Sequence, residues 1–199
     1  MKVLIACEFS GIVREAFRKK GHDAWSCDLL PAEDNSPYHK QIDVRALLGY
    51  PNWDIIIAFP PCTHLAVSGA RWFKEKELEQ QKALDFVRLL LNPPSNDKTK
   101  LLKIALENPI SIISTKIRKP DQIIQPWQFG HPEIKATCLW LQNLPLLKPT
   151  KTVPPPYKAR VHLEPPGPER WKNRSRTYKG IADAMADQWG NIGNKGIFD

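Results

Sequence analysis

The sequence predicts an α/β fold built on a doubly wound, mostly parallel sheet. Short apolar runs alternate with helical patterns through the first half of the chain, and several of these runs end at an acidic residue or a cysteine. Strands that are separated by helical crossovers pair in parallel. The chain of 199 residues is long enough to bury one core. We therefore expect one domain over residues 1–199.

The elements of the first half follow from their patterns and end signals. "KVLIACE" predicts a strand, and "SGIVREAFRKKG" predicts a helix with Ser10 as its N-cap and Gly21 as its stop. "HDAWSCD" predicts a strand ending at Asp28, "VRALLG" a short helix and "WDIIIAF" a fully apolar strand. These elements cover residues 2–8, 10–21, 22–28, 44–49 and 53–59.

A long helix, a strand and a last helix follow. Residues 75–91 have helical periodicity, with an apolar face that we assign to Leu78, Leu84, Val87 and Leu91. Residues 100–109 predict a strand that breaks at its terminal proline, and residues 178–190 predict a C-terminal helix with Ile181, Ala182, Met185 and Trp189 on one face.

Residues 145–170 are rich in proline and predict an extended loop, because proline prevents long regular elements. Tyr157, Val161 and Leu163 would give this loop apolar side chains that pack against the domain.

Composition narrows the classes of function. The net charge of +8 suits a polyanionic partner such as nucleic acid. The apolar run at the N-terminus is too short for a signal peptide, and no segment approaches a membrane span, so we expect a cytoplasmic protein with no membrane contact. The four cysteines lie far apart without a C-x-x-C pair, which argues against a zinc site and a disulfide framework.

Four chemically active residues follow the predicted strands: Glu8, Asp28, Cys62 and Glu107. Open α/β sheets bind their ligands beyond the carboxyl ends of parallel strands, so we expect these side chains at one edge. Gly11 opens the helix after the first strand, and Asp28 follows it at the end of the next strand. In nucleotide-binding folds, an acid at that position accepts hydrogen bonds from ribose hydroxyls.

Cys62 comes directly after Pro60 and Pro61, which end the strand and stiffen the loop. A thiolate is a soft nucleophile that adds to an electron-poor carbon and can leave again. Glu107, in "ENP", ends the neighbouring strand and could protonate or hydrogen-bond a ring nitrogen. A thiol and a carboxyl group on adjacent strand ends are suited to covalent activation of a pyrimidine.

The order of "EFSG", the acid at 28, "PPC" and "ENP" resembles the C5-cytosine DNA methyltransferases. "KATCLWL" and "RSRTYKGIADAMADQWG" resemble small phage-type members of this group. The resemblance implies S-adenosylmethionine as methyl donor, DNA as partner, Cys62 as the nucleophile toward C6 of cytosine, and Glu107 as the partner of N3. It implies no metal. The activity it implies is that of a DNA (cytosine-5-)-methyltransferase.

The resemblance also assigns binding residues. The donor site would comprise Glu8, Phe9, Ser10, Gly11, Asp28, Leu29, Asp43 and Pro60. The substrate site would comprise Pro61, Arg71, Asn108, Lys135, Arg174 and Arg176. Lys135, Arg174 and Arg176 stand in for the arginines of a Q-x-R-x-R motif that has no clean match here.

Three further features depart from the family pattern. The first motif lacks a second glycine, and "ENP" replaces "ENV". Only 32 residues separate "KATCLWL" from "RSRT", too few for a conventional target-recognition domain. Either the proline-rich loop supplies a minimal substitute, or the protein reads little sequence.

Other functions compete with this interpretation. A free pyrimidine nucleotide or RNA could be the substrate, which would account for the missing recognition domain. Exocyclic amino-methyltransferases carry an Asp/Asn-Pro-Pro-aromatic motif, but Phe59 occupies the position whose side chain would accept hydrogen bonds from the amino group. A nucleic-acid-binding module with a degenerate methyltransferase fold would not require both Cys62 and Glu107.

Overall fold

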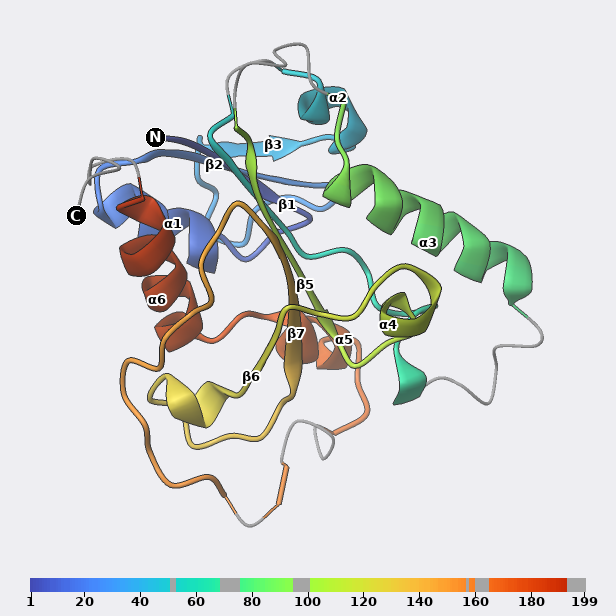
Figure 1. The fold of residues 1–199 in the computed structure, drawn as a ribbon, viewed down its shortest axis with the longest axis vertical. Helices are drawn as coiled ribbons and strands as arrows, with labels where there is room; N and C mark the ends of the chain where they lie inside the picture. The colour runs from blue at the N-terminus through green and yellow to red at the C-terminus, as the bar shows by residue number, and fades with distance from the viewer. Residues whose placement is uncertain (51–52, 69–75, 95–100, 157, 160–164, 193–199) are drawn as a thin grey trace.

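The computed structural model describes residues 1–50, 53–68, 76–94, 101–156, 158–159 and 165–192. These residues form a seven-stranded sheet in the order β3-β2-β1-β4-β5-β7-β6, with helices on both faces (Figure 1). The strands are β1 (Lys2–Ala6), β2 (Asp23–Asp28), β3 (His39–Gln41), β4 (Ile55–Ala58), β5 (Lys103–Pro109), β6 (Gln122–Ile124) and β7 (Thr137–Gln142).

The helices of the described residues are α1 (Ile12–Lys19), α2 (Arg45–Leu48), α3 (Glu77–Leu91), α4 (Ile113–Lys116), α5 (Arg170–Ser175) and α6 (Lys179–Gly190), with a 3₁₀ turn η2 at Pro126–Gln128. Strands β1 to β5 pair in parallel, whereas β7 is antiparallel to both of its neighbours. The predicted fold class, a Rossmann-like and doubly wound α/β sheet, is confirmed.

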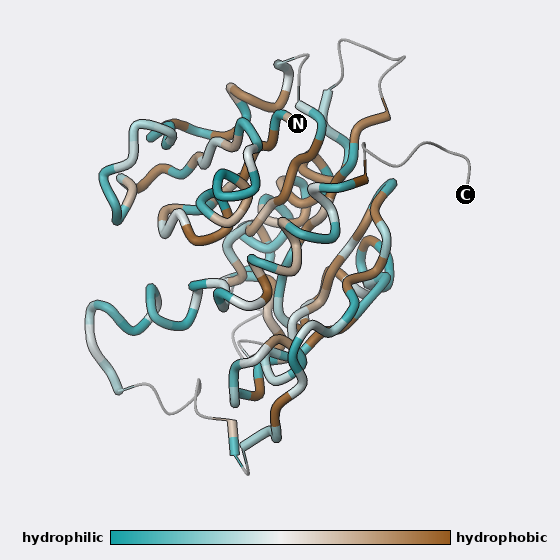
Figure 2. Tube along the Cα trace, turned by 90° about the vertical axis from the view of Figure 1, so that its left-hand side faces the viewer, coloured by the Kyte–Doolittle hydropathy of each residue, from teal (hydrophilic) through white to brown (hydrophobic). Residues whose placement is uncertain are grey.

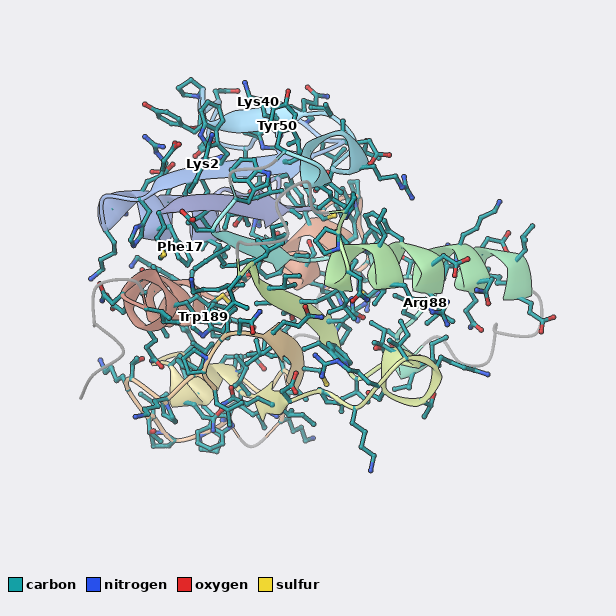
Figure 3. The ribbon with its side chains drawn as sticks, turned by 45° about the horizontal axis from the view of Figure 1, so that its top comes forward. Lys2, Phe17, Lys40, Tyr50, Arg88 and Trp189 are labelled. Atoms are coloured by element: carbon teal, nitrogen blue, oxygen red, sulfur yellow. The ribbon has the colours of Figure 1, made fainter. Side chains whose placement is uncertain are left out.

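The sheet separates two apolar cores, because successive residues of a strand face opposite sides. In β1, Val3 and Ile5 face the core formed with α1 and α6, while Leu4 faces the core formed with α2 and α3. Hydrophobic stretches accordingly run through the centre of the chain trace (Figure 2). Phe17 and Trp189 lie on the side of the sheet covered by α1 and α6 (Figure 3).

The register brings the carboxyl ends of the parallel strands to one edge. Ala6 is the partner of Cys27 and of Ala58, and Ala58 is in turn the partner of Leu106. Glu107 is therefore the first residue of β5 beyond the parallel pairing. The antiparallel strand β7 begins at the same edge, because its first residue, Thr137, pairs with Pro109.

Most predicted elements form close to their expected bounds, and the assigned face of the last helix is buried. One predicted core residue is wrong: Leu78 is 65% exposed, since it lies in the first turn of α3, before the buried stretch that begins at Leu84. The sequence did not predict β3, β6, β7, α4 or α5. Tyr157, Val161 and Leu163 lie outside the described residues.

Helix α1 begins differently from the prediction. Its N-cap is Gly11, with a φ of 71°, and Ser10 is not the N-cap. Its end is as expected: Gly21 has a φ of 81°, its N–H donates to the carbonyl of Arg18, and the N–H of His22 donates to the carbonyl of Phe17. This is a Schellman motif, in which glycine adopts the left-handed conformation without a steric penalty.

None of the helices in the described part of the chain has the length and apolar content needed to cross a bilayer.

Candidate functional site

The predicted nucleophile lies on a short turn beyond β4. The carbonyl of Cys62 accepts backbone hydrogen bonds from Leu65 (3.0 Å) and Ala66 (2.9 Å), which close the turn behind the thiol. Cys62 is exposed, whereas Cys27 and Cys138 are buried and Cys7 is partly buried. Cys62 is thus the cysteine that solvent and a substrate can reach.

The residues that follow Glu107 hold this turn on both sides. Asn108 Nδ2 donates to the carbonyl of Pro60 at 2.9 Å, ahead of the thiol. Behind it, Ile112 N–H donates to Leu65 and Val67 N–H donates to Ile110, at 3.0 and 3.2 Å. These bonds fix the position of Cys62 relative to β5, and therefore relative to Glu107.

Asn108 and Pro60 support the loop, whereas Pro61 is exposed. The sequence predicts a substrate contact for Asn108, but this residue is 1% exposed and its amide supports the loop. Pro60, predicted in the donor site, is buried and supplies the carbonyl that Asn108 holds. Pro61 is exposed beside the thiol, as a substrate contact requires.

The charge of Glu107 acts on the Cys62 thiol. Partial burial of the sulfur, and then the negative charge of Glu107, raise the pKa of the Cys62 thiol. Burial also raises the pKa of Glu107, which favours its protonated form.

Two cations complete this part of the site. The charge of Lys135 opposes the pKa increases of both Cys62 and Glu107, and Arg174 also favours the Cys62 thiolate. Lys135 precedes β7, so the antiparallel strand delivers it to the edge where the parallel strands end. Its Nζ donates to the carbonyl of Arg174 at 2.8 Å, which brings α5 to the same place.

The third predicted cation, Arg176, forms its ion pair with Glu33. Arg176 donates two hydrogen bonds to the carboxylate of Glu33, at 2.6 and 3.1 Å, and one to Asn173 Oδ1 at 2.7 Å. This ion pair raises the pKa of Arg176. Arg71 lies outside the described residues.

The donor half of the site lies at the ends of β1 and β2. Glu8 is buried, and its carboxylate accepts hydrogen bonds from Val13 N–H (2.7 Å) and Arg14 N–H (3.2 Å). It therefore satisfies the first turn of α1, although burial raises its pKa to about 7. Ser10 Oγ donates a longer hydrogen bond to the same carboxylate at 3.4 Å.

Gly11 has a conformation that only glycine adopts readily, and a Cβ there would overlap the guanidinium of Arg14. Arg14 is fully buried and forms ion pairs with Glu15 and Asp34. The chain therefore turns tightly from β1 into α1 around this arginine.

Asp28 is partly buried at the carboxyl end of β2. Its Oδ1 accepts the Leu30 N–H at 2.9 Å, and a carboxylate can accept further hydrogen bonds. Burial raises its pKa. Leu29 beside it is 71% exposed, which offers an apolar surface next to the carboxyl group.

The other predicted donor residues have protein partners. Asp43 forms an ion pair with Arg45, and hydrogen bonds from Arg45 lower the pKa of Asp43. Phe9 is 9% exposed and packs against Trp171, with ring centroids 5.5 Å apart. Cys7, which the sequence did not single out, lies near Asp28 and Asp43; burial and these charges raise its pKa.

The structure thus brings the predicted residues together in two groups at one sheet edge. Sequence reasoning missed Trp171 and Glu33, which link α5 to the donor half. A basic and aromatic run, "ERWKNRSR", was the signal that could have identified α5. No group of three His, Cys, Asp or Glu side chains among the described residues could hold a metal ion.

Comparison with known proteins finds similarity among solved structures. No family model matches the chain, and no curated protein matches it. Among solved structures, the chain is similar to a candidate DNA modification methyltransferase encoded within an E. coli prophage, with 16% sequence identity and a TM-score of 0.47. The match covers 77% of this chain and 52% of that protein, so this chain spans about half of its neighbour's length.

Proposed function

We propose that this protein transfers the methyl group of S-adenosylmethionine to C5 of cytosine in DNA through a covalent bond between Cys62 and C6. The observation that carries the proposal is the placement of an exposed cysteine, Cys62, and a carboxyl group, Glu107, at the ends of two adjacent strands, with Asn108 hydrogen-bonded to the loop that carries the cysteine. Both lie at the sheet edge where a doubly wound fold binds ligands.

The two pKa shifts fit such a reaction. Cytosine N3 needs a hydrogen bond or a proton when C6 is attacked, and the raised pKa of Glu107 allows it to supply one. Protonated Glu107 carries no negative charge, so the charge that raises the Cys62 pKa is absent while Glu107 donates a hydrogen bond to N3. Lys135 and Arg174 then favour the thiolate.

The reaction follows from these roles. The Cys62 thiolate adds to C6, and the electron pair of the C5–C6 bond makes C5 nucleophilic. After C5 has accepted the methyl group, loss of its proton restores the double bond and expels the thiolate. An exposed turn held by backbone bonds suits a sulfur that must bond and leave without moving its loop.

The donor half fits S-adenosylmethionine in part. Asp28 would hold the ribose hydroxyls, Leu29 would cover the adenine, and the turn at Gly11 would lie beside the rest of the donor. When bound, the donor supplies a methyl group on a positively charged sulfur. We propose support roles for Glu8 and Asp43, because their carboxylates are engaged by the α1 backbone and by Arg45.

The test is transfer of label from isotopically labelled S-adenosylmethionine to duplex DNA, single-stranded DNA, RNA and free cytidine nucleotides. We expect label at C5 of cytosine in DNA and background transfer with C62S, whose donor binding should be unchanged. C27S is the matched control, because a serine can keep the hydrogen bond that Cys27 makes to the carbonyl of Ile42. DNA containing 5-fluorocytosine should remain attached to Cys62, since fluorine blocks loss of the C5 proton.

Each pattern of labelling would lead to a different conclusion. Label on the exocyclic nitrogen would replace the proposal with amino-methyl transfer. Label on nucleotides or RNA alone would change the substrate but keep the thiol mechanism. Binding of DNA without transfer to any substrate would favour a non-catalytic module.

A further inference from the structure

Helix α5 is held to the protein without contributing to either core. All six of its residues are described, and none of them is buried. It is attached through Lys135, which donates to the carbonyl of Arg174, and through Arg176, which pairs with Glu33 just beyond its end. A helix without an apolar face toward the core is kept in place here by polar contacts at its C-terminal end.

Trp171 makes this attachment unusual. Its side chain is 49% exposed. In the sequence it follows a segment of charged and proline residues. Its ring is tilted at 53° against Phe9, so the contact leaves much of its surface open to solvent. An exposed indole ring on a helix with no buried residues leaves a flat aromatic face on which a base can stack.

The charges on α5 point to the kind of partner. Residues 169–176 contain four cations and one acid. Lys172 is paired with Glu169 at 3.0 Å and Arg176 with Glu33, whereas Arg174 forms no ion pair with any described residue. Arg174 is also the residue of α5 whose charge reaches Cys62.

We propose that α5 is the surface that holds an unpaired nucleic-acid strand beside the active site. Trp171 stacks on a base that neighbours the target nucleotide, and Arg174 binds a phosphate close to Cys62. The proposal rests on the proposed function and identifies the part of the chain that contacts the acceptor strand. In Figure 1, α5 lies next to the lower ends of β5 and β7, the edge that carries Glu107 and Lys135.

Nucleic acid fits this surface better than an acidic protein would. Proteins that bind single strands combine a cationic track along the backbone with aromatic side chains on which bases stack. An exposed tryptophan lies three positions before Arg174, which has no ion-pair partner in the described part of the chain, so one helix supplies both. The net charge of +8 favours the same class of partner.

The experiment measures the binding of fluorescently labelled single-stranded and duplex DNA, and RNA of the same sequence, by anisotropy over a range of salt concentrations. It uses C62S without donor, so that neither transfer nor a covalent bond contributes. In this background, W171A should weaken single-strand binding about fivefold or more, since stacking on one base contributes at least that much. W171F should retain most of the affinity.

A second variant, R174A, tests whether the charge of Arg174 contacts a phosphate. R174A should reduce the slope of log affinity against log salt by about 0.7, the value for one lost phosphate contact on a single strand. R88A is the matched control, because it removes the same charge from α3 (Figure 3). Thermal unfolding of each variant checks that the fold is intact.

The outcomes separate the two proposals. If W171A and R174A bind every nucleic acid as R88A does, the surface is wrong, whatever the enzyme transfers. If W171A weakens only donor binding, Trp171 belongs to the donor site and the inference is overturned. If both variants lose strand binding while the wild-type protein methylates nothing, the surface stands and the proposed function fails.

Discussion

At the scale of single residues, burial and neighbouring charges determine the pKa of each thiol in this protein. Of four cysteines, the exposed one has a partly buried carboxyl group, Glu107, and two cations among the charges that act on its thiol. The other thiols are protected, since burial raises the pKa values of Cys27 and Cys138 to about 11. Selective reactivity of Cys62 therefore depends on where each sulfur lies.

The influence of Glu107 on Cys62 leads to a prediction about pH. Because the negative charge of Glu107 raises the thiol pKa, E107Q should lower it, and the rise of the alkylation rate with pH should move to lower pH. K135M removes a charge that lowers the thiol pKa and should move the profile to higher pH. The measurement is the rate of iodoacetamide modification at Cys62, located by mass spectrometry.

C62S is the control that measures iodoacetamide modification of the other cysteines. Profiles that coincide for the wild type, E107Q and K135M would show that these groups do not act on the thiol. The same E107Q protein should lose most of its methyl transfer, because a glutamine amide can donate a hydrogen bond to N3 but cannot transfer a proton to it. Faster alkylation combined with lost transfer would distinguish a chemical role of Glu107 from loss of structure.

At the scale of elements, the site depends on how strands end and helices begin. The Cys62 turn is held by bonds to the continuation of β5, and α1 begins at a left-handed glycine whose neighbouring carboxylate, Glu8, accepts the first N–H groups. Each helix or strand boundary therefore positions a functional group. Substitutions at these boundaries should have effects beyond the local backbone.

Gly11 and Gly21 provide a matched comparison at the two ends of α1. Both have a positive φ, but a Cβ at Gly21 meets nothing within 4 Å, whereas one at Gly11 overlaps the buried Arg14. We expect G21A to cost about 1 kcal/mol of unfolding free energy. G11A should cost about 2 kcal/mol more, because displaced Arg14 loses its ion pair with Asp34.

Urea denaturation of both variants measures these costs. Equal destabilisation would mean that Arg14 moves aside without losing its partners. G11A should also weaken donor binding, which can be followed by calorimetry, whereas G21A at the far end of α1 should not.

At the scale of the whole molecule, the C-terminal helix closes one face of a sheet that begins at the N-terminus. Trp189 on α6 is fully buried, and its indole N–H donates to the carbonyl of Pro145 at 3.0 Å. α6 packs against α1 in the same core, so the two ends of the described chain share one hydrophobic layer. α5 precedes α6 in the chain and contributes no residue to that hydrophobic layer.

Two tryptophans should therefore differ sharply in their contribution to stability. W189A should destabilise the protein by about 3–5 kcal/mol, because it leaves a large cavity and an unpaired carbonyl. W171A should change stability by about 0.5 kcal/mol or less, as is usual for an exposed residue. Urea denaturation of the two variants measures the difference, and a large loss of stability in W171A would assign α5 a structural role.

The sequence alone predicted the parallel strands β1, β2, β4 and β5 and the acidic and cysteine residues that follow them, but not the short parallel strand β3. Those strands are short apolar runs between amphipathic helices, a local pattern that depends on the period of side-chain burial. Glu8, Asp28, Cys62 and Glu107 could be found because strand ends are marked by proline or by charge. β6 and β7 were missed because their antiparallel return lies between irregular, proline-containing segments that carry little periodic signal.

Only the tertiary structure decided which predicted residues are available to a ligand. Glu8, Asn108 and Arg176 have the polar groups expected of binding residues, but each is engaged by a protein partner. Lys135 and Arg174 meet at Cys62 because β7 runs antiparallel and α5 folds back to the same edge. Hydrogen bonds and ion pairs between distant residues depend on the register of the sheet, which no local sequence pattern specifies.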